Sequence, residues 1–248
     1  MRSKVVGSFE EAVAGVENGS SILVAGFGEP GTPHNLVEAL YKQGASHLTL
    51  IANGAGQTRE DGVITMGNLI EAKRVARVIL AFTASTHPSR KTPLEYLNEA
   101  GEIEAQITPQ GTLAERIRAG GAGIPAFFTP AGVGTEVTKG KEHREFGGRT
   151  YVMEEAITAN YALIRCWKAD SFGNLVFRRS QRNFNPIMAM AADCTLVEAE
   201  EIVEVGTLDP DLIHTSGIFV QRVVSIPDAG GRLEIPPLSL QKTAKNRP

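Results

Sequence analysis

Residues 22–33 restrict the fold of this chain more than any other stretch, because they read as a buried strand, a glycine loop and a helix start in direct succession. Their sequence is I-L-V-A-G-F-G-E-P-G-T-P. The apolar residues at its start are typical of a strand that is buried on both faces. Gly26, Gly28 and Gly31 then form a loop, and Pro33 suits the first turn of a helix, which tolerates a missing N–H. This order offers backbone donors to an anion or an acyl oxygen.

Strands and helices are predicted to alternate along the rest of the chain. Apolar runs bounded by turn residues predict further strands at 47–52, 77–82, 102–107, 125–129, 161–167, 174–177, 195–205 and 218–224. Helices are predicted at 8–16, where Ser8 and Glu11 form a capping box, and after Pro33, where Gly44 ends the helix. Further helices are predicted at 66–73 and 183–192. Two more are predicted to begin at Thr92 and Pro93, and at an N-cap formed by Thr112 with Glu115 in the box position.

This alternation predicts an α/β fold, namely an open, mostly parallel, doubly wound sheet with helices on both faces. We expect one domain over residues 1–225 and a C-terminal tail over 226–248. Residues 139–149 are charged and are predicted to form an exposed excursion. The segment 195–205 carries glutamates at 198, 200, 201 and 204, so burial is expected only at Leu196, Val197, Ile202, Val203 and Val205.

Four glycine turns each follow a predicted strand, at 26–31, 53–56, 109–111 and 132–134. In a doubly wound sheet, ligands bind beyond the carboxyl ends of the strands. We therefore expect the four turns to rim one pocket. Glycine at such positions lets the backbone approach a ligand closely.

Composition excludes several classes of protein. The chain has 248 residues, 42% of them hydrophobic, and a formal net charge of −3. No long Lys/Arg block suggests a nucleic-acid partner, and no apolar run reaches membrane-spanning length. Charges within residues 1–16 are unlike a secretory signal, so a cytoplasmic location is expected. Cys166 and Cys194 are expected to be free, buried thiols, and no ligand spacing of the five histidines suggests a metal site.

The spacing of Gly26, Gly28 and Gly31 also fits the dinucleotide pattern G-x-G-x-x-G. That pattern requires an acidic residue about twenty positions on, to hold a ribose hydroxyl. Asn53 stands there instead, so a plain tight turn is favoured over a dinucleotide site. A non-catalytic nucleotide or sugar-phosphate binding protein on the same fold remains the alternative to an enzyme.

Residues 18–33 resemble the glycine-loop signature of the family I coenzyme A transferases, with Ala25 replacing the first glycine of G-G-F. The resemblance covers most of the chain and is most specific for the α subunit of 3-oxoacid (succinyl-type) transferases, whose fold is of the CoA-transferase / NagB-RpiA type. It extends through the stretches 108–127, 132–135, 167–170, 173–178, 182–185 and 209–214.

The resemblance implies a ping-pong transfer of coenzyme A between an acyl group and a free carboxylate, through a glutamyl thioester. The attacking glutamate of the family lies in S-E-N-G, which this chain lacks, although E-N-G occurs at 17–19. A β subunit in an α2β2 assembly is therefore expected to supply it. Gln110 is implied as the oxyanion donor, with coenzyme A as a substrate and no bound cofactor. The implied substrate-binding residues are Gly26, Phe27, Gly28, Gly31, Asn53 and Gly54.

The acyl pocket departs from the succinyl-type pattern. L-C-G-I-P is replaced by E-P-G-T-P, N-N-A-G-V by N-G-A-G-Q, and S-Y-V-G-E-N is absent from 83–92. Glu29 would disfavour a second carboxylate nearby, which argues against succinate. A short 3-oxoacid or related acyl group, in ketone-body or fatty-acid metabolism, is the expectation.

Overall fold

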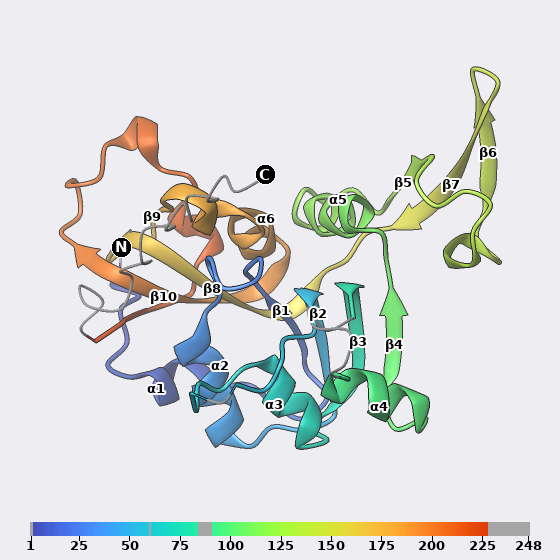
Figure 1. The fold of residues 1–248 in the computed structure, drawn as a ribbon. Coiled ribbons are helices and arrows are strands. Elements are labelled where there is room, and N and C mark those ends of the chain that lie inside the picture. The colour runs from blue at the N-terminus through green and yellow to red at the C-terminus, as the bar shows by residue number, and fades with distance from the viewer. Residues whose placement is uncertain (1, 60, 84–90, 228–248) are drawn as a thin grey trace, which may run out of the picture.

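Two β-sheets of different character form the chain (Figure 1). The computed structural model describes residues 2–59, 61–83 and 91–227. The strands of the larger sheet are β1 (Ser21–Val24), β2 (Leu48–Gly54), β3 (Val75–Phe82), β4 (Glu104–Ile107), β8 (Ala159–Asp170), β9 (Leu175–Val176), β10 (Ala192–Val203) and β11 (Arg222–Ser225).

The larger sheet has the order β11-β10-β8-β1-β2-β3-β4, and every pairing along this path is parallel. The short β9, which corresponds to the strand predicted at 174–177, pairs with β8 in the antiparallel sense. The chain builds outward from β1 to β4, then crosses to β8 and builds outward the other way. The strand order therefore switches between β1 and β8, where ligands of doubly wound sheets bind.

Helices cover both faces of this sheet (Figure 1), so the predicted doubly wound fold is confirmed. One core lies under α1 (Phe9–Val13), α2 (His34–Gln43), α3 (Met66–Glu71) and α4 (Pro93–Glu99). The other lies under α5 (Gln110–Gly121) and α6 (Asn185–Met190). Neighbouring strand residues alternate between the two cores: Ile22 and Val24 pack in the first, and Leu23 packs in the second.

A three-stranded antiparallel sheet, which we call the arm, projects from the body beyond α5 (Figure 1). Its strands are β5 (Ala126–Thr129), β6 (His143–Phe146) and β7 (Arg149–Glu155), in the order β5-β7-β6. The expected exposure of 139–149 is confirmed at β6, whose four residues are all exposed. Phe146 packs edge-on between Phe128 and Tyr151, with ring centroids 5.5 Å apart in both pairs.

The arm corrects two predictions. The strand at 125–129 exists, but it pairs with β7 rather than with the parallel sheet. The glycine turn at 132–134 follows that strand, so it lies in the arm and does not rim the pocket of the body. β5 pairs with a segment more than 20 residues further along the chain, which local periodicity does not reveal, whereas β6 and β7 form a hairpin whose turn is Gly147-Gly148.

Several predicted helix ends are confirmed. Ser8 accepts a hydrogen bond from the Glu11 N–H at 3.1 Å, although Glu11 Oε2 accepts from the Gly7 N–H at 2.8 Å, so the predicted capping box is only half formed. Gly44 closes α2 in the left-handed region at a φ of 99°. Thr92 and Glu95 form a reciprocal capping box. The predicted start of α5 is wrong, because the helix begins at Gln110 after Pro109, which places Thr112 inside its first turn.

The C-terminal strands differ from prediction in burial and bounds. Glu198 of β10 is fully buried, whereas Val205 is 46% exposed. Ile218 lies in a single 3-10 turn (Gly217–Phe219), and the last strand begins only at Arg222. Cys166 and Cys194 are free, and Cys166 is buried while Cys194 is partly buried. Most of the predicted tail, from residue 228 on, lies outside the described residues.

Candidate functional site

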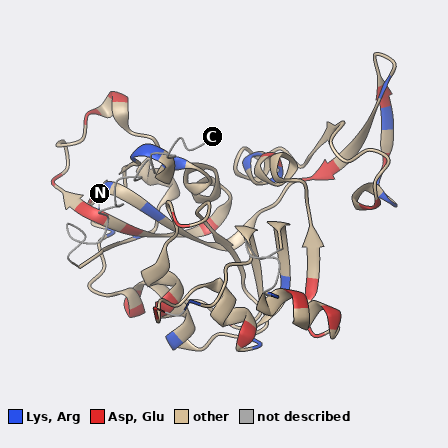
Figure 2. Cartoon of the chain, in the orientation of Figure 1, with Lys and Arg blue, Asp and Glu red and all other residues tan. Residues whose placement is uncertain are grey.

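A pocket of about 1030 Å³ opens at the carboxyl ends of β1, β2 and β3. Six of the predicted site residues line it: Gly26, Phe27, Gly28, Asn53, Gly54 and Gln110. These strand ends carry no charged residue in Figure 2, so the charge of the pocket comes from its loops. A second hollow of about 830 Å³ lies between residues 2–6 and 216–222, and no predicted site residue lines it.

Two side-chain amides meet at the edge of the pocket. Gln110 Nε2 donates a hydrogen bond of 2.6 Å to Asn53 Oδ1. Asn53 stands near the end of β2, and Gln110 is the first residue of α5, which follows β4. Because an amide nitrogen carries two hydrogens, this bond leaves Gln110 a second donor for a ligand oxygen. A donor fixed by a helix start and a neighbouring amide suits a developing oxyanion.

The glycine loop keeps its shape through internal hydrogen bonds. Thr32 Oγ1 donates to the Gly28 carbonyl at 2.6 Å, and the Phe27 N–H donates to the Pro30 carbonyl at 3.2 Å. Gly26 has a φ of 115°, and a Cβ there would lie 2.1 Å from Thr32 Oγ1. A side chain therefore fits neither the backbone angle nor the space at Gly26.

Gly31 does not line the pocket. It connects the glycine loop to α6, which covers the face of the sheet opposite to α2. Asn185 Nδ2, at the start of α6, donates to the Gly31 carbonyl at 3.1 Å, and Asn183 Nδ2 donates to the Pro30 carbonyl at 2.8 Å. A Cβ on Gly31 would lie 2.6 Å from Asn185 Nδ2. These two asparagines belong to the R-N-F-N stretch at 182–185. Sequence reasoning did not reveal that this stretch contacts the glycine loop.

A buried group of charges, which we call the inner cluster, lies behind the start of α2 and comprises Arg165, Glu198 and Glu200. Glu198 Oε2 accepts the Leu36 N–H at 3.0 Å, and its Oε1 lies 3.4 Å from Arg165 Nη1. Burial raises the pKa of Glu198 to about 7, although Arg165 and the Leu36 N–H act in the opposite direction. Arg165 also contacts Glu200 Oε1 at 3.1 Å.

The inner cluster removes the main support for a dinucleotide site. A helix N-terminus binds phosphate through its free N–H groups. At α2, the carboxylate of Glu198 already accepts from Leu36, and Pro33 has no N–H to offer. Asn53 also stands where the pattern needs an acidic residue to bind the ribose. The loop therefore lacks both the free N–H groups for the phosphates and the acidic residue for the ribose.

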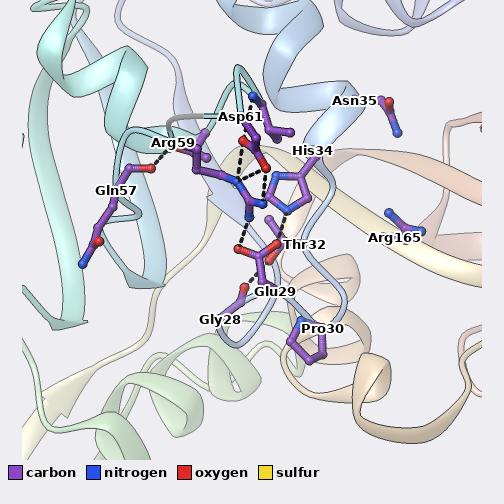
Figure 3. Close-up of polar contacts among 12 residues, drawn as sticks. Gly28, Glu29, Pro30, Thr32, His34, Asn35, Gln57, Arg59, Asp61 and Arg165 are labelled. Atoms are coloured by element: carbon purple, nitrogen blue, oxygen red, sulfur yellow. Dashed lines mark hydrogen bonds and ion pairs between the residues drawn. The ribbon is translucent and has the colours of Figure 1, made fainter. Parts of the chain in front are cut away.

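A second charged group, which we call the pocket cluster, comprises Glu29, His34 and Arg59, which line the pocket, and Asp61, which contacts Arg59 (Figure 3). Arg59 Nη1 contacts Glu29 Oε1 at 2.6 Å, and Arg59 Nη2 contacts Asp61 Oδ2 at 2.5 Å. His34 Nε2 lies 3.1 Å from Glu29 Oε2. The hydrogen bond from Arg59 lowers the pKa of Asp61 to about 2 and raises the pKa of Arg59.

The pocket cluster corrects the argument that Glu29 presents an uncompensated negative charge to the acyl group. Its carboxylate is paired with Arg59, which sequence reasoning did not single out because residues 29 and 59 are on different loops. Thr58, Arg59 and Glu29 all line the pocket. The polar stretch 83–92 lies largely outside the described residues.

The E-N-G sequence at 17–19 lies far from this pocket along the sheet. It forms the turn between α1 and β1, where the Gly19 N–H donates to the Ser46 carbonyl at 2.9 Å. This turn precedes the amino end of β1, whereas the pocket opens at the carboxyl end. Glu17 therefore does not face the Gln110–Asn53 pair.

The described residues contain no group of three or more His, Cys, Asp or Glu side chains placed to hold a metal ion. Within the same residues, none of the helices combines the length and the apolar character needed to span a bilayer.

The chain is similar to known proteins over most of its length. The family model for coenzyme A transferase matches residues 6–225. The chain is 48% identical over 221 residues to the A subunit of the probable succinyl-CoA:3-ketoacid coenzyme A transferase of Bacillus subtilis, covering 89% of each chain. It is 45% identical over 229 residues to the A subunit of the 3-oxoadipate CoA-transferase of Pseudomonas putida, covering 92% of this chain and 96% of the relative.

A solved structure of an acyl-CoA transferase from Escherichia coli O157:H7, in a thioester complex with coenzyme A, is similar over 92% of this chain. The TM-score is 0.76 at 25% sequence identity, and the chain spans about half (48%) of that longer protein. The fold, the glycine loop and these matches define the class: this chain belongs to the coenzyme A transferase family.

Proposed function

We propose that this chain is the α subunit of a 3-oxoacid-type coenzyme A transferase. It moves coenzyme A between a short acyl-CoA and a free carboxylate in the cytoplasm. The observation that carries the proposal is the Gln110–Asn53 pair, which lines the same pocket as the glycine loop at the carboxyl ends of β1, β2 and β3. The relatives named as subunits of 3-ketoacid and 3-oxoadipate transferases support the substrate class.

The described pocket offers donors for an oxyanion rather than a carboxylate poised to attack. Among its lining residues, the one acidic side chain is Glu29, and Arg59 and His34 hold it. The proposal therefore assigns the nucleophile to a β subunit that bears S-E-N-G, in an α2β2 assembly. Both relatives are named as one subunit of a transferase, which supports a partner chain.

The chemistry runs in two balanced halves. The partner's glutamate carboxylate attacks the thioester carbonyl, coenzyme A leaves as a thiolate, and a mixed anhydride forms. The thiolate then attacks the glutamyl carbonyl and releases the free acid, which leaves coenzyme A on the glutamate. The acceptor carboxylate repeats both steps in reverse. Each attack builds negative charge on a carbonyl oxygen, which Gln110 is placed to stabilise.

Thioester exchange between an acyl-CoA and a carboxylate tests the proposal. We expect exchange when this chain is paired with a partner that bears S-E-N-G and none by the chain alone, because the nucleophile is absent from it. In the assembled enzyme, Gln110→Ala should lower kcat about 10²–10³-fold, as loss of one oxyanion donor does. Gln106→Ala on β4, outside the pocket lining, is the matched control.

Exchange catalysed by the isolated chain would contradict the two-subunit proposal. If Gln110→Ala leaves exchange unchanged while the isolated chain binds a nucleotide or sugar phosphate tightly, the binding-protein alternative holds instead.

A further inference from the structure

The pocket cluster is not needed for the transfer chemistry, yet it places a guanidinium inside the pocket. Arg59 lines the same cavity as Gln110 and the glycine loop. Its side chain is 33% exposed, so solvent or a ligand reaches it. Among the described lining residues it is the one Lys or Arg side chain. A ligand with a second carboxylate would find its counter-charge here.

The two sides of the Arg59 guanidinium are held differently (Figure 3). Asp61 holds one side through Nε at 3.0 and 3.2 Å and through Nη2 at 2.5 Å. Asp61 is itself fixed, because it accepts the Val63 N–H at 3.2 Å and comes from the same loop. This arrangement fixes the direction in which the guanidinium points.

The other side of the guanidinium meets Glu29 from the opposite loop. Nη1 contacts Glu29 Oε1 at 2.6 Å, and the Glu29 side chain is 67% exposed. An ion pair this exposed contributes little to stability, because water solvates both partners when they separate. A ligand carboxylate can therefore take the place of Glu29 at Nη1 without breaking the bonds from Asp61.

We propose that Arg59 determines substrate choice by binding the distal carboxylate of a dicarboxylic acyl group or acceptor, and that Glu29 is the internal carboxylate that such a ligand displaces. This inference rests on the proposed function and adds to it the residue that selects the acyl group. With Glu29 in place, the pocket suits an acyl group without a distal charge; with Glu29 displaced, it accepts a dicarboxylate. His34, 3.1 Å from Glu29, offers Glu29 a second partner after displacement.

The test compares succinate with butyrate, which have the same chain length and differ in the distal carboxylate. Both serve as acceptors for the assembled enzyme, and kcat/KM is measured for each. Arg59→Gln should lower kcat/KM for succinate about 10–100-fold, because a charge-assisted contact is lost, and should change butyrate by less than about 3-fold. Glu29→Gln should raise kcat/KM for succinate about 3–10-fold, because a competing carboxylate is removed.

Lys73→Gln and Glu102→Gln are matched controls, because they alter an exposed ion pair beside β3 and β4, away from the pocket lining. If Arg59→Gln lowers kcat/KM equally for succinate and butyrate, the proposal is overturned, and Arg59 only holds the two loops together. A loss of succinate transfer in Glu29→Gln would also overturn it.

A binding measurement separates this inference from the proposed function. Succinate should raise the Tm of the assembled wild-type protein more than butyrate does, and Arg59→Gln should abolish the difference. This result can hold even if no transfer occurs, in which case only the proposed function fails. Equal Tm shifts by both acids in the wild-type protein would overturn the role of Arg59, whatever the activity.

Discussion

The inner cluster and the pocket cluster each pair an arginine with a glutamate, but the two pairs differ in burial. Arg165 is 14% exposed against a fully buried Glu198, whereas Arg59 is 33% exposed against a Glu29 that is 67% exposed. The inner cluster fixes the start of α2 through the Leu36 N–H, while Glu29, His34 and Arg59 of the pocket cluster line the pocket. This difference in burial is the basis on which we propose a stabilising role for Arg165 and a ligand-binding role for Arg59.

The difference has a physical basis in solvation. Removing one partner of a buried pair leaves a charge that water cannot reach, which destabilises the fold strongly. Removing one partner of an exposed pair leaves a charge that water solvates at once. The two clusters should therefore respond in opposite ways to the same kind of substitution, in stability and in substrate choice.

The largest expected effect is that of Arg165→Met. At pH 8, where Glu198 is ionised in the wild-type protein, the change leaves the buried carboxyl without its cation, so the free energy of unfolding should fall by about 3–5 kcal/mol. Urea unfolding measures it. Lys168→Met, on the same strand in a more exposed pair with Glu201, is the control and should cost less than about 1 kcal/mol. Equal losses in the two variants would show that burial does not separate them.

The next effect is a pH dependence that comes from Glu198. Its pKa is raised to about 7 in the folded protein, so the native state binds more protons than the unfolded state between about pH 4.5 and pH 7. Stability from this group is present below that range and is lost as pH rises through it. Between pH 5 and pH 8, the free energy of unfolding of the wild-type protein should fall by about 1–3 kcal/mol more than that of Glu198→Gln.

Chemical unfolding at both pH values, in the wild-type protein and the variant, gives this difference directly. If the two proteins lose the same stability over the range, the buried carboxylate is not the titrating group.

The smallest expected effect on stability is that of Arg59→Gln. Both carboxylates that contact Arg59 are more than half exposed, so the unfolding free energy should change by less than about 1 kcal/mol. Thermal unfolding measures it alongside Arg165→Met. A loss as large as that of Arg165→Met would mean that the pocket cluster holds the loop rather than awaiting a ligand.

Local sequence patterns predicted the parts of the fold that depend on neighbours in sequence. The buried strand before Gly26, the helix start at Thr92 and Pro93, and the left-handed Gly44 follow from residues within a few positions of one another. The parallel strands followed from apolar runs. The meeting of Asn53 and Gln110 required the sheet order, which the alternation of strands and helices supplied.

The features that sequence reasoning missed depend on distant partners. Glu198 was expected to be exposed, because a glutamate is rarely buried alone, and its partner Arg165 is 33 residues away. Thr112 and Glu115 match a capping box, but Glu115 bonds to Arg118 and the helix begins at Gln110. The Arg59–Glu29 contact joins two loops that no local pattern connects.

The central claim is that this chain supplies the oxyanion donors while another chain carries the nucleophile. Intact-mass measurement tests it most directly: the assembled protein is incubated with an acyl-CoA and the mass of each chain is read. The account predicts a coenzyme A adduct on the S-E-N-G partner and an unmodified mass for this chain. A coenzyme A adduct on this chain, with the partner unmodified, would contradict it.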